Sequence, residues 1–124
     1  MVNRYANVSD MLGATLSRVH QDGDEEITFE TNDGRRFVMF HEQDCCENVT
    51  IDDVVGDLQS LVGNPILVAE EVSSDDEEFE AKNYAESFTW TFYKFATIKG
   101  HVDIKWFGSS NGYYSEGVSF RQTA

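Results

Sequence analysis

A histidine and two cysteines lie close together in the middle of the chain, and these residue types can bind metal ions or act as nucleophiles. His41, Asp44, Cys45 and Cys46 have the spacing His-x-x-x-Cys-Cys. A structural zinc site needs about four tetrahedral ligands, and adjacent cysteines seldom both reach one metal ion. We therefore predict no metal and no cofactor, and keep a metal- or thiol-dependent protein centred on His41, Cys45 and Cys46 as an alternative.

Catalytic motifs are incomplete elsewhere in the sequence. A nucleophilic pair of Cys45 with His41 or His101 would need an orienting group and an oxyanion hole, and the sequence indicates neither. The acidic stretch 22–26 lacks the alternating oxygen ligands of a calcium loop. There is no phosphate-binding glycine loop, no Gly-x-Ser-x-Gly and no His-Glu-x-x-His. We predict that the protein is not an enzyme.

The cysteines also bear on the cellular compartment. A disulfide between neighbours would close a very small ring and join no distant parts of the chain, so Cys45 and Cys46 are predicted to be reduced thiols. Residues Met1 to Asp10 lack the basic and apolar regions of a signal peptide, and no stretch has the length of a membrane span. These features predict a cytoplasmic protein.

Charge is the outstanding property of the composition. The 124 residues include 23 acids and 9 bases, which gives a net charge of −14 at pH 7. Such a chain repels nucleic acid and anionic membranes and attracts basic protein surfaces. We predict no direct contact with nucleic acid or membrane, and a basic protein surface as the partner.

The acids are concentrated in one part of the chain. The 45 residues from Phe37 to Ala81 contain 13 acids and no lysine or arginine. This segregation predicts one electronegative face, which either is simply solvated or imitates the phosphates of nucleic acid in a basic groove of another protein. The predicted partner-binding residues are Glu42, Asp44, Glu47, Asp52, Asp53, Asp57, Glu70, Glu71, Asp75, Asp76, Glu77, Glu78, Tyr113 and Tyr114.

Apolar periodicity and turn residues predict a single α+β domain over residues 1–124, with a loose lead-in over 1–12. It is mostly antiparallel, with roughly seven strands and one short helix between strands 3 and 4. Asn32-Asp33-Gly34 is a strong hairpin signal, and Gln21-Asp22-Gly23-Asp24 and Lys99-Gly100 also predict turns. The predicted elements are strands over 14–19, 27–29 and 35–41 in a meander, a helix over 52–61, a buried strand over 66–69, an acidic loop over 73–80, and strands over 88–93, 102–107 and 113–121.

Aromatic residues dominate the last third of the chain. We predict that Phe88, Trp90, Phe92 and Trp106 lie in the core, because no basic groove surrounds them for base stacking. Tyr113 and Tyr114 follow a flexible polar turn and could form a contact patch, also in a homodimer, since tyrosine buries area at low entropic cost. An ordinary hairpin with its tyrosines against the sheet is the alternative.

Several segments carry a resemblance to a known family. They are His41-Glu42-Gln43-Asp44-Cys45-Cys46-Glu47, Gly56-Asp57-Leu58, Pro65 to Glu71, Glu86 to Tyr93 and Ser110-Asn111-Gly112-Tyr113-Tyr114-Ser115-Glu116. The chain resembles, after about Leu12, a domain-of-unknown-function family of small proteins from tailed phages and some bacteria. The resemblance supplies no established activity, and it implies a phage or mobile-element setting inside a bacterial cell.

Together these features favour a phage-encoded inhibitor that binds a host nucleic-acid-binding defence protein, such as a CRISPR effector, through its acidic face. An anti-CRISPR or related anti-defence protein would need no catalytic motif. The alternatives are the metal- or thiol-dependent protein and an accessory phage structural protein that packs through Tyr113 and Tyr114.

Overall fold

The fold is all-β, and the α+β prediction is wrong. The computed structural model describes residues 3–43, 46–75, 87–110 and 116–124, in which nine antiparallel strands form two sheets and the only helical elements are two 3-10 turns. The elements are β1 (Arg4–Tyr5), η1 (Val8–Met11), β2 (Leu16–Asp22), β3 (Glu26–Thr31), β4 (Arg36–Phe40), β5 (Asn48–Val55), η2 (Leu58–Leu61), β6 (Val68–Asp75), β7 (Ser87–Thr97), β8 (Gly100–Ser110) and β9 (Ser119–Gln122).

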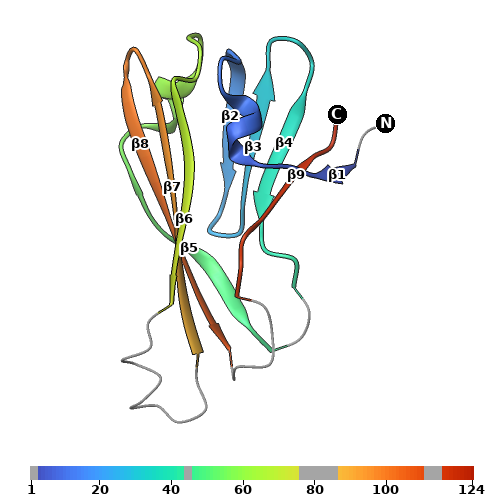
Figure 1. Ribbon diagram of the computed structural model, residues 1–124, viewed down its shortest axis with the longest axis vertical. Helices are drawn as coiled ribbons and strands as arrows, with labels where there is room; N and C mark the ends of the chain where they lie inside the picture. Colours follow the sequence, from blue (N-terminus) through green and yellow to red (C-terminus); the bar gives the residue numbers. More distant parts are fainter. Residues whose placement is uncertain (1–2, 44–45, 76–86, 111–115) are drawn as a thin grey trace.

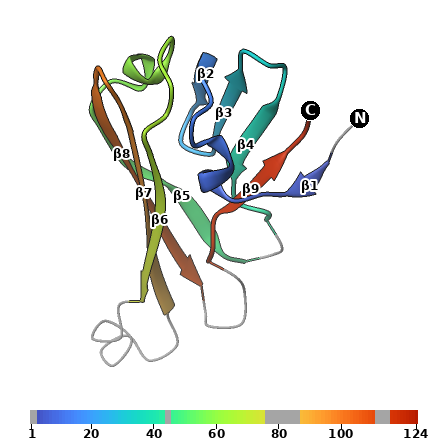
Figure 2. The same ribbon diagram turned by 45° about the horizontal axis from the view of Figure 1, so that its top comes forward.

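The two sheets pack against each other as a β-sandwich (Figure 1). One sheet has five strands in the order β1-β9-β4-β3-β2, and the other has four in the order β5-β8-β7-β6. The turned view in Figure 2 keeps the same separation, with β5 to β8 on one side. The predicted meander is confirmed as β2-β3-β4. None of the described helical segments is long and apolar enough to cross a membrane.

The core lies between the sheets and is built from alternate residues of the long strands. Phe29 of β3 contacts Phe95 of β7 with ring centroids 5.5 Å apart. Trp106 of β8 is fully buried, and its indole N–H donates to the sulfur of Met39 on β4 at 3.2 Å. These contacts join the two sheets. Met11 of η1 is also fully buried, so the C-terminal end of the segment 3–12 packs against the core.

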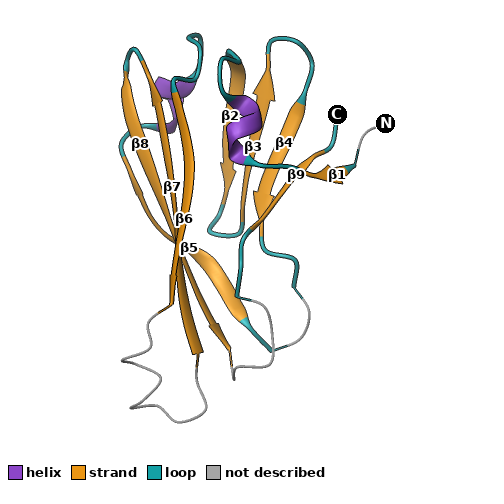
Figure 3. Cartoon of the chain, viewed as in Figure 1, coloured by secondary structure: helices purple, strands orange, loops and turns teal. Residues whose placement is uncertain are grey.

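The predicted helix over residues 52–61 is replaced by the end of β5 and the short turn η2 (Figure 3). Val49 and Ile51 are buried while Asp52 and Asp53 are exposed, as on a strand with one buried face. β-Branched residues favour that extended backbone over a helix. Gly56 then has a φ of 100°, and a Cβ there would lie 2.7 Å from the His101 carbonyl oxygen. The apolar spacing that predicted a helix arises instead from a strand followed by a tight turn.

The aromatic stripe that was predicted to face the core lies on the outer face of β7. Tyr93 and Phe95 point inward and are buried, whereas Trp90 and Phe92 are partly exposed on the outer face. Successive residues of a strand face opposite sides, so one wrong assignment reverses the whole strand. Among the four predicted core aromatics, Trp106 is in the core, while Phe88, Trp90 and Phe92 are not fully buried.

Strand boundaries differ near the acidic loop and the C-terminus. The predicted buried strand at residues 66–69 begins two residues later as β6, whose Ser73–Asp75 end occupies part of the predicted loop. Residues 76–80 of that loop lie outside the described residues. The predicted last strand is represented by β9, which pairs with both β4 and β1.

Candidate functional site

Two distinctive sequence segments meet at His41, which follows β4. Its Nδ1 lies 2.8 Å from the carbonyl oxygen of Gly117, and its Nε2 lies 2.9 Å from Oε1 of Glu47. A carbonyl oxygen only accepts, so Nδ1 donates, and the contact with Glu47 then requires a second proton between Nε2 and the carboxylate. The His41 side chain is 5% exposed and that of Glu47 is 0% exposed. The pair therefore holds residues 41–47 against the segment before β9.

A second buried carboxylate, Glu116, lies beside this contact in the chain. Its oxygens accept hydrogen bonds from the hydroxyls of Thr89 on β7 and Ser110 on β8. Gly108 provides the space, because a Cβ there would lie 2.6 Å from the Glu116 carbonyl oxygen. Sequence reasoning treated Glu116 only as part of a motif, and the one signal for this packing was the glycine in the middle of a strand.

The chemistry predicted around His41 is not assembled in the described structure. Both ring nitrogens of His41 are engaged by protein groups, and no group of three or more His, Cys, Asp or Glu side chains among the described residues could hold a metal ion. Cys46 is disulfide-bonded, and the only other cysteine is Cys45, which lies outside the described residues. The prediction of a reduced thiol at Cys46 is therefore wrong for this structure. The nucleophilic pair considered from the sequence involves Cys45, so it falls outside the described residues.

Three of the predicted partner-binding acids are engaged within the protein. Glu47 is buried against His41. Glu42 Oε1 lies 3.1 Å from Nη2 of Arg121, which also stacks over the Tyr5 ring. Asp52 Oδ2 lies 3.7 Å from Nζ of Lys105 on β8. Bases from strands distant in sequence thus meet the acidic segment, which the charge pattern along the chain did not predict.

Other predicted acids remain free of ion pairs. Asp53, Asp57, Glu70 and Glu71 are exposed and form no ion pair with any described residue. Asp57 accepts from the Gln59 amide at 3.0 Å and so caps η2. Asp75 ends β6. The remaining predicted residues, Asp44, Asp76, Glu77, Glu78, Tyr113 and Tyr114, lie outside the described part of the chain.

The structure adds to the acidic surface a turn that the sequence predicted at residues 21–24 but whose acids were not among the predicted partner-binding residues. It joins β2 to β3 and carries Asp22, Asp24, Glu25 and Glu26, none of which forms an ion pair with a described residue. A β-bulge in β5 accompanies a hydrogen bond of 2.7 Å from the Ile51 amide to the Asp24 carbonyl. The acidic turn of one sheet is therefore tied to the acidic strand β5 of the other.

A pocket of about 360 Å³ opens beside this turn, lined by all four of its acids together with Phe40 and His41. Its lining holds four carboxylates and one imidazole whose nitrogens are already engaged. The surroundings are strongly anionic, so the pocket favours cationic groups. The described residues that line it include no hydroxyl and no thiol.

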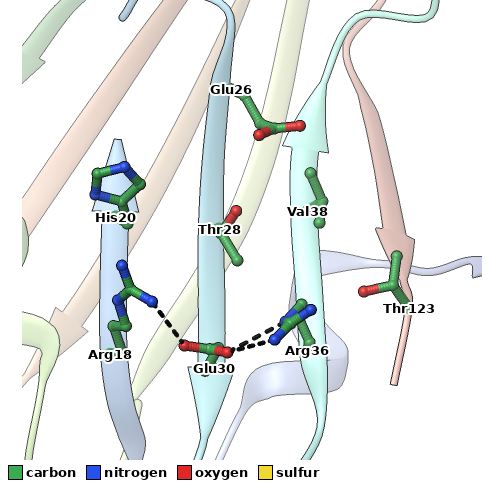
Figure 4. Close-up of a pocket in the computed structure, with 8 residues that line it drawn as sticks. All are labelled: Arg18, His20, Glu26, Thr28, Glu30, Arg36, Val38 and Thr123. Atoms are coloured by element: carbon green, nitrogen blue, oxygen red, sulfur yellow. Dashed lines mark hydrogen bonds and ion pairs between the residues drawn. The ribbon is translucent and has the colours of Figure 1, made fainter. Parts of the chain in front are cut away.

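Basic residues collect instead on the outer face of the five-stranded sheet (Figure 4). A pocket of about 490 Å³ there contains Arg18 of β2 and Arg36 of β4, which both bind Glu30 of β3. The distances are 2.9 Å for Arg36 and 3.8 Å for Arg18. One carboxylate thus lies between two exposed guanidinium groups, and exposed ion pairs of this kind contribute little to stability. Glu26 lines both this pocket (Figure 4) and the pocket beside the acidic turn, so the two surfaces adjoin.

Tyr93 is an unusual buried group on the inner face of β7. It is fully buried, and its hydroxyl has no hydrogen-bond partner in the described structure. Burial raises the pKa of Tyr93 far above its ordinary value, and the neighbouring Glu71 carboxylate raises it further. Burial also raises the pKa of Glu71, although the residue as a whole is exposed at the sheet edge.

Replacing Tyr93 by phenylalanine is expected to raise the free energy of unfolding by about 1 kcal/mol, because an unsatisfied buried hydroxyl is removed while the ring packing remains. Chemical denaturation measures the change. Tyr5→Phe is the control, since the Tyr5 hydroxyl bonds Glu42 and Arg121 at the surface, and this variant should show no gain. A destabilised Tyr93→Phe protein would contradict the assignment of an unpartnered hydroxyl.

The comparisons with known proteins identify a family but no activity. The chain belongs to the family described as Domain of unknown function (DUF7448), which it matches over residues 9–120. No curated protein and no solved structure matches the chain. Membership of the family assigns no activity, so the function has to be argued from the surface and the charges.

Proposed function

We propose that the protein is a phage-encoded inhibitor of a host nucleic-acid-binding defence protein, acting in the bacterial cytoplasm as an anti-CRISPR or related anti-defence protein. The phage setting rests on the resemblance of the segments at 41–47 and 110–116 to small acidic proteins of tailed phages. The proposal assigns no catalysis to the chain. Its action is occupation of a basic groove that otherwise binds nucleic acid.

The observation that carries the proposal is unneutralised acidity on a rigid framework. The net charge is −14, and the acidic turn and the exposed Asp53 form no ion pairs with described residues. The hydrogen bond from Ile51 to Asp24 fixes the backbone of the turn against β5, so the position of the turn is set before binding. A turn whose backbone is already ordered loses less conformational freedom on association, which favours affinity.

Electrostatics supplies the mechanism of inhibition. A basic groove attracts the acidic turn over a distance of about 10 Å at an ionic strength of 0.1 M, and this attraction speeds association. Carboxylates then replace phosphates as partners of the lysines and arginines in the groove. The inhibitor and nucleic acid therefore compete for one surface, and raised salt weakens both.

The test is a nucleic-acid binding assay with a panel of purified CRISPR effectors and restriction enzymes. We expect the wild-type protein to displace DNA or RNA from at least one of them. The triple variant Asp22→Asn, Asp24→Asn, Glu25→Gln should inhibit at least about tenfold more weakly, since it removes local charge from the binding surface.

A matched control separates the local effect from net charge. The variant Asp10→Asn, Glu30→Gln, Asp33→Asn removes the same number of charges, but Glu30 and Asp33 are already paired with arginines. It should inhibit as the wild type does. If both triple variants lose the same amount of inhibition, the acidity acts through the net charge and not through the acidic turn. If the wild-type protein displaces nucleic acid from no member of the panel, the proposal is rejected.

A further inference from the structure

The outer face of the four-stranded sheet is aromatic. Trp90 and Phe92 of β7 and Phe107 of β8 are partly exposed there, and Val72 of β6 is 48% exposed. The solvent face of an antiparallel sheet is normally polar, with apolar residues confined to the core side. We call these four residues the aromatic face. Folding alone does not explain why these apolar side chains are exposed to solvent.

Strand register makes the aromatic face continuous. Trp90 is directly opposite Phe107, and their ring centroids are 4.4 Å apart. Phe92 is directly opposite Val72 on one side and Lys105 on the other. The apolar side chains therefore form one strip across β6, β7 and β8.

Acids border this strip on both edge strands. Exposed Asp52 and Asp53 belong to β5, and exposed Glu70 belongs to β6. These two strands are the opposite edges of the sheet. The apolar centre therefore has acids along both edges, and Lys94 of β7 is directly opposite Glu70.

The protein already holds one of its own cations by this chemistry. The Lys105 ammonium lies 4.2 Å from the Trp90 ring centroid and 3.7 Å from Asp52 Oδ2, so a ring and a carboxylate bind it together. On the other sheet, Arg121 stacks 4.4 Å over the Tyr5 ring while it pairs with Glu42. Aromatic and acidic groups in this arrangement favour a cation, and arginine most of all, because its planar guanidinium stacks and is weakly hydrated.

We propose that the aromatic face is the docking surface for arginine side chains of the partner protein, with their guanidinium groups stacked on Trp90 and Phe107 and paired with the acids of β5 and β6. This inference rests on the proposed function and names the chemistry of the partner surface. Charge complementarity favours a basic partner protein over a second copy of this chain. A second copy of this chain would bring another −14 molecule against the same acidic margins, whereas an arginine-bearing groove neutralises them.

The test compares oligoarginine with oligolysine peptides of equal length by isothermal titration calorimetry. We expect the wild-type protein to bind oligoarginine about tenfold more tightly, since stacking on the rings adds to the charge attraction that both peptides share. The variant Trp90→Leu keeps an apolar side chain but loses the ring, so it should lose this preference. Tyr5→Ala removes an exposed ring of the other sheet and should keep it.

Four results obtained without a nucleic-acid-binding partner overturn the inference. They are equal affinity for the two peptides, an unchanged preference in a folded Trp90→Leu protein, loss of the preference in Tyr5→Ala, and a dimer in light scattering that Trp90→Leu abolishes. The thermal unfolding midpoint of each variant establishes that it is folded. If displacement of nucleic acid survives Trp90→Leu, the docking inference fails and the proposed function stands. If the arginine preference depends on Trp90 but no effector is inhibited, the proposed function fails alone.

Discussion

Glu47→Ala is expected to lower the free energy of unfolding by about 3 kcal/mol, because it leaves the buried His41 without its partner. The carboxylate is fully buried and lies 2.9 Å from His41 Nε2. Without Glu47, the Nε2 atom of the buried ring loses its hydrogen-bond partner inside the protein, while Nδ1 still bonds Gly117. Urea denaturation with a two-state fit measures the effect.

Glu42 is the matched control for this prediction. It precedes Glu47 by only a few residues, but its side chain is 57% exposed in its ion pair with Arg121. Exposed ion pairs contribute little, so Glu42→Ala should cost no more than about 1 kcal/mol. Similar small losses in both variants would show that the His41–Glu47 contact does not hold the segment in place.

Gly108→Ala is expected to destabilise the protein by about 3 kcal/mol through steric overlap. The added Cβ would lie 2.6 Å from the Glu116 carbonyl oxygen and 2.9 Å from the Glu116 Cβ. Neither atom is the end of a flexible side chain, so β8 or the Glu116 segment must move. That movement would also strain the hydrogen bonds of Glu116 to Thr89 and Ser110.

The neighbouring Ser109 provides the control for Gly108. Its side chain is on the outer face of β8 and is partly exposed, so Ser109→Ala should change the unfolding free energy by less than about 0.5 kcal/mol. The same denaturation experiment applies to both. A Gly108→Ala protein as stable as Ser109→Ala would mean that Glu116 does not pack on β8 as described.

Local signals in the sequence were sufficient for the first hairpins. Asn32-Asp33-Gly34 predicted a turn, and Gly34 has the positive φ of 90° that such a turn requires. The turn between β7 and β8 at Lys99 and Gly100 was predicted in the same way. Alternation also identified β2, β3 and β4, since each of these strands has one buried and one exposed side.

Tertiary contacts decided the parts that sequence reasoning missed. Residues 52–61 show apolar spacing that suits a helix, but pairing of β5 with β8 outweighs this weak local preference. Both faces of β7 carry aromatic residues, so alternation could not determine which of Trp90 or Tyr93 is buried. Glu47 resembled other members of an acidic run, and only the fold brings it to His41.

The surroundings of the acidic residues could be predicted only in part. Charge counting identified an excess of acids between residues 37 and 81, yet Glu42, Glu47 and Asp52 all have partners within the protein. The acidic turn at residues 22–26 lies outside that stretch and becomes part of the same surface only through its contact with β5. Pairing between sheets is long-range in sequence, and composition along the chain does not report it.

The central claim, that an acidic surface binds a basic groove, is tested most directly by the salt dependence of affinity. The measurement is the Kd for an inhibited effector over a series of salt concentrations, for the wild type and for the Asp22→Asn, Asp24→Asn, Glu25→Gln variant. We predict that wild-type affinity falls steeply with salt and that the variant binds more weakly with a shallower slope. Binding that is insensitive to salt and equal in the two proteins would contradict the claim.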